Sequence, residues 1–196
     1  MHLPNPLLQT IVVPAFTVVI VALAGRKIGK YAGWISGGVL AYTSLLLVLC
    51  GLRILREGPI YEEYVWAEFL NLKWGLLADG LSLPTALIMN VICAACAIYS
   101  IDYVEHRIKI EHGEGKRNLH TLYHTLYLLF PVGLVGVSLS TNLIQLYFFF
   151  ELTLIPSALM IALFGYIDRE RVAMMYFIWN HVGASLYLLG VILAYL

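Results

Sequence analysis

The stretch from Leu143 to Tyr166, LIQLYFFFELTLIPSALMIALFGY, decides the fold class of this chain. It is apolar over a length that crosses a bilayer as a helix, yet it contains the carboxyl side chain of Glu151. A charged side chain at the centre of a membrane helix costs about 3 kcal/mol on insertion scales, so such a residue is by default functional. We therefore interpret Glu151 as a candidate carboxyl of an ion path.

The helical face around Glu151 is apolar except for Tyr147, which is a candidate hydrogen-bond partner. A further partner then has to come from another helix, another chain or trapped water. Pro156 removes one backbone donor, which predicts a bend in the helix and a free carbonyl at Leu152. In the last apolar stretch, His181 is a candidate proton relay. An interhelical hydrogen bond is an equally good interpretation of this histidine.

The composition indicates a membrane protein. Of the 196 residues, 61% are hydrophobic and only 12% are charged, and the formal net charge is zero. A neutral chain lacks the basic surface that nucleic acid requires, so nucleic-acid binding is not expected. We predict an all-α polytopic protein with one membrane domain over residues 1–196. About six transmembrane helices are expected, at residues 7–24, 31–52, 82–103, 119–139, 143–164 and 172–195.

The connections differ in length and character. The external loop 54–80 reads as either a short hairpin or an amphipathic segment on the membrane surface, and Trp66 and Trp74 suit the membrane boundary. Ser82 is expected to cap the third helix, and Asn142 the fifth. Residues 105–118 are expected to form a charged loop.

Positive charge is distributed unequally over these connections. The first, third and fifth connections hold nine lysines and arginines, namely Arg26, Lys27, Lys30, Arg107, Lys109, Lys116, Arg117, Arg169 and Arg171. The second and fourth hold only Arg53, Arg56 and Lys73. Because excess Lys and Arg marks the cytoplasmic side, both termini are predicted to lie outside a prokaryotic plasma membrane. The amino terminus lacks the basic region of a cleavable signal peptide.

Other chemistry is not expected from this sequence. Cys93 and Cys96 form a CxxC within an apolar run, where the spacing only places two small thiols on one helix face. We recognise no phosphate-binding loop, iron–sulfur cysteine array or paired haem histidines, so no cofactor and no metal are predicted. His124 is expected to be a hydrated histidine near the cytoplasmic interface. No lysine or arginine lies inside a span to pair with Glu151.

Three motifs carry a family resemblance. They are DGLSL at residues 79–83, STNLIQLYFFFELTLIPSALMI at 140–161 and GYIDRERVAMMYFIW at 165–179. With them the chain resembles the antiporter-like membrane subunits of respiratory complex I. It also resembles their relatives in Mrp-type cation/proton antiporters and in membrane-bound hydrogenases or sulfur reductases. The likeness covers the whole chain and is strongest from Asp79 to Asn180.

The resemblance implies a role for Glu151 as an essential charge of the proton path. Such subunits usually have about fourteen helices in two inverted repeats, and a lysine on a broken seventh helix pairs with this acid. The six helices here are expected to correspond to the N-terminal part of such a subunit. Partners are then expected to be the lipid bilayer and other membrane subunits, including a chain that supplies the lysine-bearing helices.

Three hypotheses about function follow. The first is a non-redox membrane subunit of an ion-translocating oxidoreductase or Mrp-like antiporter complex, in which Glu151 forms part of a proton or sodium path. The second is a structural subunit that docks membrane modules of such a complex without transporting ions. The third is a small transporter that works as a homo-oligomer.

Overall fold

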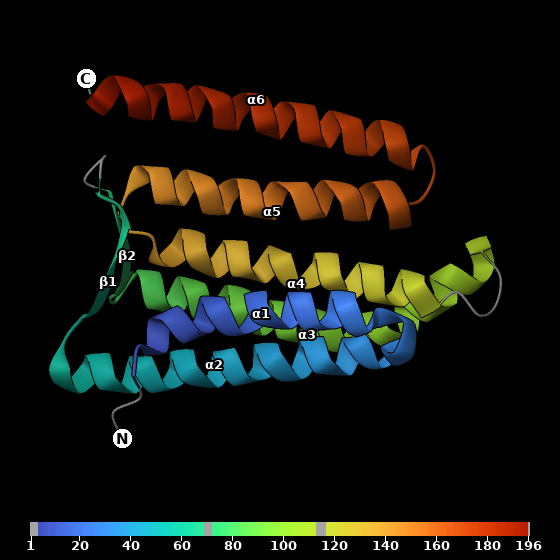
Figure 1. Cartoon of the computed structure of the whole chain (residues 1–196), viewed down its shortest axis with the longest axis horizontal. Helices are drawn as coiled ribbons and strands as arrows, with labels where there is room; N and C mark the ends of the chain where they lie inside the picture. Colours follow the sequence, from blue (N-terminus) through green and yellow to red (C-terminus); the bar gives the residue numbers. More distant parts are fainter. Residues whose placement is uncertain (1–3, 69–71, 113–116, 196) are drawn as a thin grey trace.

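The computed structural model describes residues 4–68, 72–112 and 117–195. Six long helices lie side by side, and a β-hairpin lies across one end of the bundle (Figure 1). All six are long and apolar enough to cross a membrane, which confirms the predicted all-α polytopic class. Their bounds are α1 Pro6–Ile28, α2 Tyr31–Glu57, α3 Ser82–His112, α4 Arg117–Leu139, α5 Leu143–Phe164 and α6 Arg169–Tyr195.

The expected charged loop at residues 105–118 is wrong for its first part, because α3 continues to His112. Two features extend the helix. Glu105 and Lys109 form a 3.0 Å ion pair one turn apart, and Val104 and Ile108 are buried on the inner face. Residues 113–116 lie outside the described residues.

The extension of α3 holds the turn between α5 and α6. Arg107 Nη2 donates a 2.6 Å hydrogen bond to the carbonyl of Gly165, which ends α5. The same guanidinium lies 4.1 Å from the centre of the Tyr166 ring, and the hydroxyls of Tyr103 and Tyr166 are 2.6 Å apart. A cation at the carboxyl end of a helix also suits the helix dipole.

The long connection after α2 contains a hairpin rather than a surface helix. Strands β1 (Ile60–Ala67) and β2 (Leu72–Ala78) pair antiparallel, and Leu76 forms an isolated bridge with Ser140 in the α4–α5 connection. Trp74 packs edge-on against Trp66 and Phe149, with ring centres 5.2 and 5.0 Å apart. The hairpin is therefore fixed to the helix ends beneath it.

Two carboxylates of the connection cap helices. Buried Glu62 accepts 2.9 Å hydrogen bonds from the backbone N–H groups of Leu7 and Leu8 in the first turn of α1. Asp79 Oδ1 accepts from the N–H groups of Leu81 and Ser82, at 2.9 and 2.8 Å. Asp79, not Ser82, therefore supplies the capping oxygen of α3, since the Ser82 hydroxyl donates to the carbonyl of Leu77.

Small residues bring α4 against α5. A Cβ on Gly136 would come 2.2 Å from the ring of Phe149, and one on Gly133 would come 2.8 Å from the Phe149 carbonyl. Phe149 is only 1% exposed and belongs to the larger core cluster. The close packing of these two helices determines how α5 faces the rest of the bundle.

The sequence predicted that the side chain of His124 is open to the aqueous interface, and this prediction is wrong. The residue is fully buried in α4, because Gly33 lets α2 approach its ring closely. A Cβ on Gly33 would lie 3.0 Å from two atoms of the imidazole.

Candidate functional site

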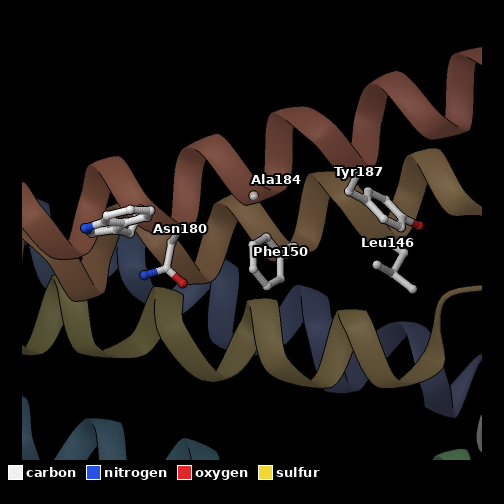
Figure 2. Close-up of a pocket in the computed structure, with 7 residues that line it drawn as sticks. Leu146, Phe150, Asn180, Ala184 and Tyr187 are labelled. Carbon is white, nitrogen blue, oxygen red and sulfur yellow. The ribbon is translucent and has the colours of Figure 1, made fainter.

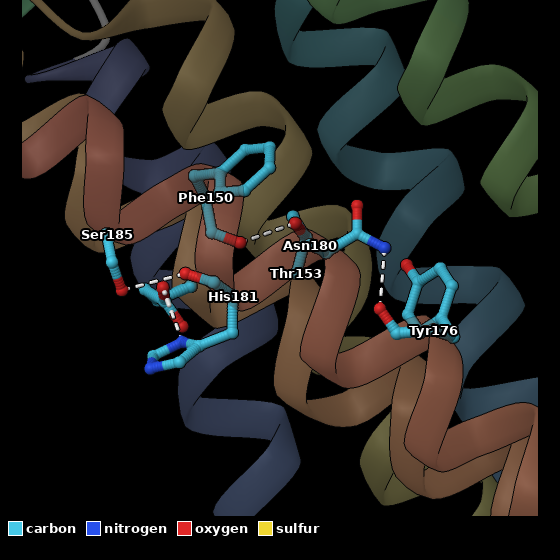
Figure 3. A network of polar contacts seen from close by, with 7 residues as sticks. Phe150, Thr153, Tyr176, Asn180, His181 and Ser185 are labelled. Carbon is cyan, nitrogen blue, oxygen red and sulfur yellow. Dashed lines mark hydrogen bonds and ion pairs between the residues drawn. The ribbon is translucent and has the colours of Figure 1, made fainter.

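Glu151 and His181 meet between α5 and α6. The distance from Glu151 Oε1 to His181 Nδ1 is 3.2 Å, which allows a hydrogen bond or, if the ring is protonated, an ion pair (Figure 3). The Glu151 side chain is 16% exposed and that of His181 is 46% exposed. The sequence presented the two residues as separate candidates, and the structure joins them near the middle of both helices.

The hairpin fixes the position of α5 at its amino end. Asn142 caps the helix as predicted, because its Oδ1 accepts a 2.7 Å hydrogen bond from the N–H of Gln145. Buried Gln145 in turn accepts a 3.1 Å hydrogen bond from the N–H of Gly75 in β2. Glu151 follows Gln145 by less than two turns, so the hairpin determines the depth of the carboxyl group in the bundle.

Neighbours on α6 orient the imidazole. Phe177 stacks on His181, with ring centres 5.3 Å apart and an angle of 8° between the planes. Ser185 donates a 2.8 Å hydrogen bond to the carbonyl of His181 (Figure 3). Phe177 precedes His181 by one helical turn, so the ring is supported from its own helix.

A second polar contact joins the same two helices. The hydroxyls of Ser157 in α5 and Tyr176 in α6 are 3.0 Å apart. Asn180 donates a 2.8 Å hydrogen bond to the carbonyl of Tyr176 (Figure 3). Ser157 and Tyr176 are not among the site residues predicted from the sequence. Ser157 follows Glu151 on α5, and Tyr176 precedes His181 on α6, each by between one and two helical turns. This spacing from the predicted site residues was the signal available in the sequence.

Tyr147 lies one turn before Glu151 on α5, within the range of a side-chain hydrogen bond to its carboxyl group. The candidate partner named from the sequence is thus a neighbour of the acid. Glu151 has an imidazole beside it from one helix and a phenol from its own.

A mainly apolar groove lies between the same two helices. It has a volume of about 330 Å³ and lies between α5 and α6 (Figure 2). Its lining includes Leu146, Phe150, Asn180, Ala184 and Tyr187. Tyr187 donates a 3.3 Å hydrogen bond to the carbonyl of Leu143, so its polar end is engaged by α5.

The chemistry available at the site is proton exchange. A carboxylic acid and an imidazole at hydrogen-bond distance can pass one proton between oxygen and nitrogen without any other reactant. In the part of the chain that the structure describes, no group of three or more His, Cys, Asp and Glu side chains could hold a metal ion.

Comparisons with known proteins find the same kind of similarity in sequence and in fold. Residues 140–196 match the family described as NADH:quinone oxidoreductase/Mrp antiporter, TM. The putative antiporter subunit mnhA2 of Staphylococcus aureus strain MRSA252 is 31% identical over 173 residues, which is 87% of this chain and 20% of that protein. The corresponding protein of strain MSSA476 is 30% identical over 172 residues, with the same coverage of both chains. The chain thus spans about a fifth of the length of these curated relatives.

Solved structures share the fold. A chain in the structure of the Mrp complex from Dietzia sp. DQ12-45-1b superposes with a TM-score of 0.76 at 21% identity, covering 93% of this chain and 18% of that one. A chain of the membrane-bound sulfane sulfur reductase, an archaeal respiratory membrane complex, gives a TM-score of 0.73 at 18% identity, covering 94% and 36%. Sequence and fold therefore agree: this chain is similar to antiporter-like membrane subunits, and its residues 140–196 match the family model.

Proposed function

We propose that the chain forms part of an ion-translocating membrane complex, Mrp-like or related to respiratory oxidoreductases, and that Glu151 carries protons in it. The observation that carries this proposal is the 3.2 Å contact between Glu151 and His181, near the middle of two membrane helices. An acid at this depth requires a partner, and a histidine is the side chain whose own protonation changes near neutral pH.

The proposed step is a reversible transfer. The protonated carboxyl of Glu151 gives its proton to Nδ1 of neutral His181, leaving a carboxylate beside an imidazolium. The imidazolium then releases a proton from Nε2 toward the open side of α6, where the side chain is 46% exposed. Tyr147 steadies the carboxylate through its hydroxyl. Sodium could replace the proton only if further oxygen ligands joined Glu151, so the proton is the ion we favour.

Partner subunits complete the site in this proposal. The side chain of His181 is half exposed, and α6 lies at one edge of the bundle (Figure 1). A polar pair open to hydrocarbon is costly, whereas one covered by protein or a hydrated cavity is not. We propose that other membrane subunits cover this edge. Because the resemblance implies a lysine that pairs with the acid, we propose that a lysine-bearing helix outside the six described here approaches Glu151.

The proposed setting is a prokaryotic cell membrane with both termini outside. The hairpin and both ends of the described chain lie at one end of the bundle, and the three connections rich in Lys and Arg lie at the other (Figure 1). Cysteine labelling of intact cells tests this orientation at Gly80 and Asp168. An impermeant reagent should modify Gly80→Cys and leave Asp168→Cys unmodified, and the reverse pattern would reject the proposed topology.

A structural role is the second candidate function. The contact of Glu151 with His181 also fastens α6 to α5, as do the contacts between Ser157 and Tyr176 and between Tyr187 and Leu143. A subunit that only docks membrane modules would use the pair in this way. Its acid would then be a hydrogen-bond acceptor and would not exchange protons.

Transport by vesicles containing the complete complex separates the two functions. Glu151→Gln preserves the shape and the hydrogen bond but cannot exchange a proton, so we expect ion pumping to fall at least tenfold. Glu151→Asp should give an intermediate rate because it keeps the acid and shortens its reach. If the chain has only a docking role, Glu151→Gln should leave the rate of ion pumping nearly unchanged. Glu151→Asp should then lower it as much as Glu151→Ala does. Assembly is checked separately on the same membranes.

A further inference from the structure

The first two turns of α4 contain a pair of buried histidines that the site around Glu151 does not use. His124 is 0% exposed and His120 is 8% exposed, one helical turn apart. They lie at the end of the bundle opposite the hairpin, where α3 ends and α4 begins (Figure 1). Gly33 of α2 packs directly against the His124 ring.

The nitrogen atoms of these rings lack protein partners. Among the described residues, neither Nδ1 nor Nε2 of His124 has a hydrogen-bond partner, and neither does Nδ1 of His120. A neutral imidazole always presents one N–H donor and one acceptor nitrogen. The edge-on contact with the Tyr123 ring, at 5.2 Å between centres, can engage one N–H at most and leaves the acceptor unmatched.

Buried polar atoms without a hydrogen-bond partner are rare in native proteins, and in a membrane span they are especially unfavourable. Water is the ligand that such atoms usually take, provided that the site offers two to four polar partners. Three ring nitrogens without a partner, on side chains one turn apart in α4, offer water such polar partners.

Charged groups surround the outer histidine. Glu105 and Lys109 of α3 and Lys30 in the α1–α2 turn all act electrostatically on His120. Glu105 and Lys109 are themselves paired at 3.0 Å, and Tyr123 adjoins His124. Glu105, in the last part of α3, is thus an anionic group that acts on the outer histidine.

We propose that His120 and His124 hold water between them and bind one proton, which enters past Glu105 from this end of the bundle. The proton adds to a neutral ring nitrogen and gives an imidazolium that the Glu105 carboxylate stabilises, and its release restores the neutral ring. This site is separate from Glu151. Its tests need no transport, so failure here and failure of the proposed function are distinguishable.

Nitrogen-detected NMR of the full chain in lipid bilayers tests the water. Magnetisation transferred from water should reach the ring nitrogens of His124 about as fast as those of exposed His106. The side-chain amide of Asn90 is the dry control, because it is 1% exposed and donates to protein oxygens of α2. Transfer to His124 as slow as to Asn90 would overturn the proposal. His124→Phe identifies the signals, and His124→Gln replaces it if the phenylalanine variant does not fold.

The same spectra test the proton. On acidification, one ring of the pair should become doubly protonated while the chain remains folded, and Glu105→Gln should move this change to lower pH because it removes the stabilising anion. Glu63→Gln, at the opposite end of the bundle, is the matched control and should have no effect. A pair that stays neutral until the chain unfolds, or that titrates identically without Glu105, would contradict the proposal.

Discussion

Glu151 and His181 are thirty residues apart in the sequence and 3.2 Å apart in the structure, between Oε1 and Nδ1. Each would be an expensive side chain alone in a membrane helix. Together they satisfy one another across the contact between α5 and α6. The distance is compatible with a neutral hydrogen bond and with an ion pair, which is the property that a proton relay requires.

The coupling of these two residues is testable by a double-mutant cycle on unfolding in detergent. His181→Phe alone leaves the carboxyl group without its partner and should lower the free energy of unfolding by about 1–3 kcal/mol. Combining it with Glu151→Leu should recover most of this loss, because the double variant no longer has a carboxyl group without its partner on α6. Strictly additive effects of the two substitutions would show that the side chains are not coupled.

Glu62 is predicted to make the main polar contact between the hairpin and α1. Glu62→Ala leaves two N–H groups, one buried and one partly buried, without their acceptor and should cost about 1–3 kcal/mol of stability. Glu63→Ala, in the same strand, removes only exposed contacts, namely an ion pair with Lys73 and a hydrogen bond from the Tyr61 hydroxyl, and should change the melting temperature little. Equal melting temperatures of the two variants would count against the capping role.

Gly136 should not tolerate a side chain. Gly136→Ala places a methyl group 2.2 Å from the Phe149 ring, so α4 and α5 must separate or the ring must move. We expect a loss of about 1–3 kcal/mol, as for other overpacked cores. Gly38→Ala, where a Cβ would meet nothing within 4 Å, is the matched control and should be neutral or slightly stabilising. Thermal unfolding of both variants in the same detergent provides the comparison.

The cap of α3 predicts a dependence on acid pH. Hydrogen bonds from the N–H groups of Ser82 and Leu81 and from the Ser82 hydroxyl lower the pKa of Asp79 below its ordinary 3.8. A lowered pKa in the folded state means that the cap contributes fully above pH 3.8 and that the contribution is lost as the pH falls through the lower, native value. Melting temperatures measured from neutral pH downward should therefore fall less steeply for Asp79→Asn than for the wild type. Parallel curves would exclude this contribution.

Hydrophobic runs identified the six spans because length and composition alone determine which helices can cross a bilayer. Local signals were also readable, such as the cap at Asn142. Where each span ends was less evident, since the charges after Tyr103 extend α3 through an ion pair instead of ending it. Charge content does not distinguish a solvated loop from a helix that leaves the membrane.

Contacts between distant segments explain what the sequence did not reveal. Glu151 was recognisable as a buried acid and His181 as a polar residue in a span, but their contact depends on the rotation of α6 against α5. The burial of His124 depends on Gly33, more than ninety positions earlier. In the sequence, Glu62 looks like any acidic residue of a loop, because its contact with the amino end of α1 depends on the hairpin. No local pattern carries this information.

The central claim is that the carboxyl of Glu151 exchanges a proton with His181. Infrared difference spectroscopy of the chain in lipid bilayers, recorded between neutral and acidic pH, observes this exchange directly. The account predicts a band of a protonated carboxyl group that is absent in Glu151→Gln and shifted in His181→Gln. Difference spectra of Glu151→Gln identical to those of the wild type would contradict it.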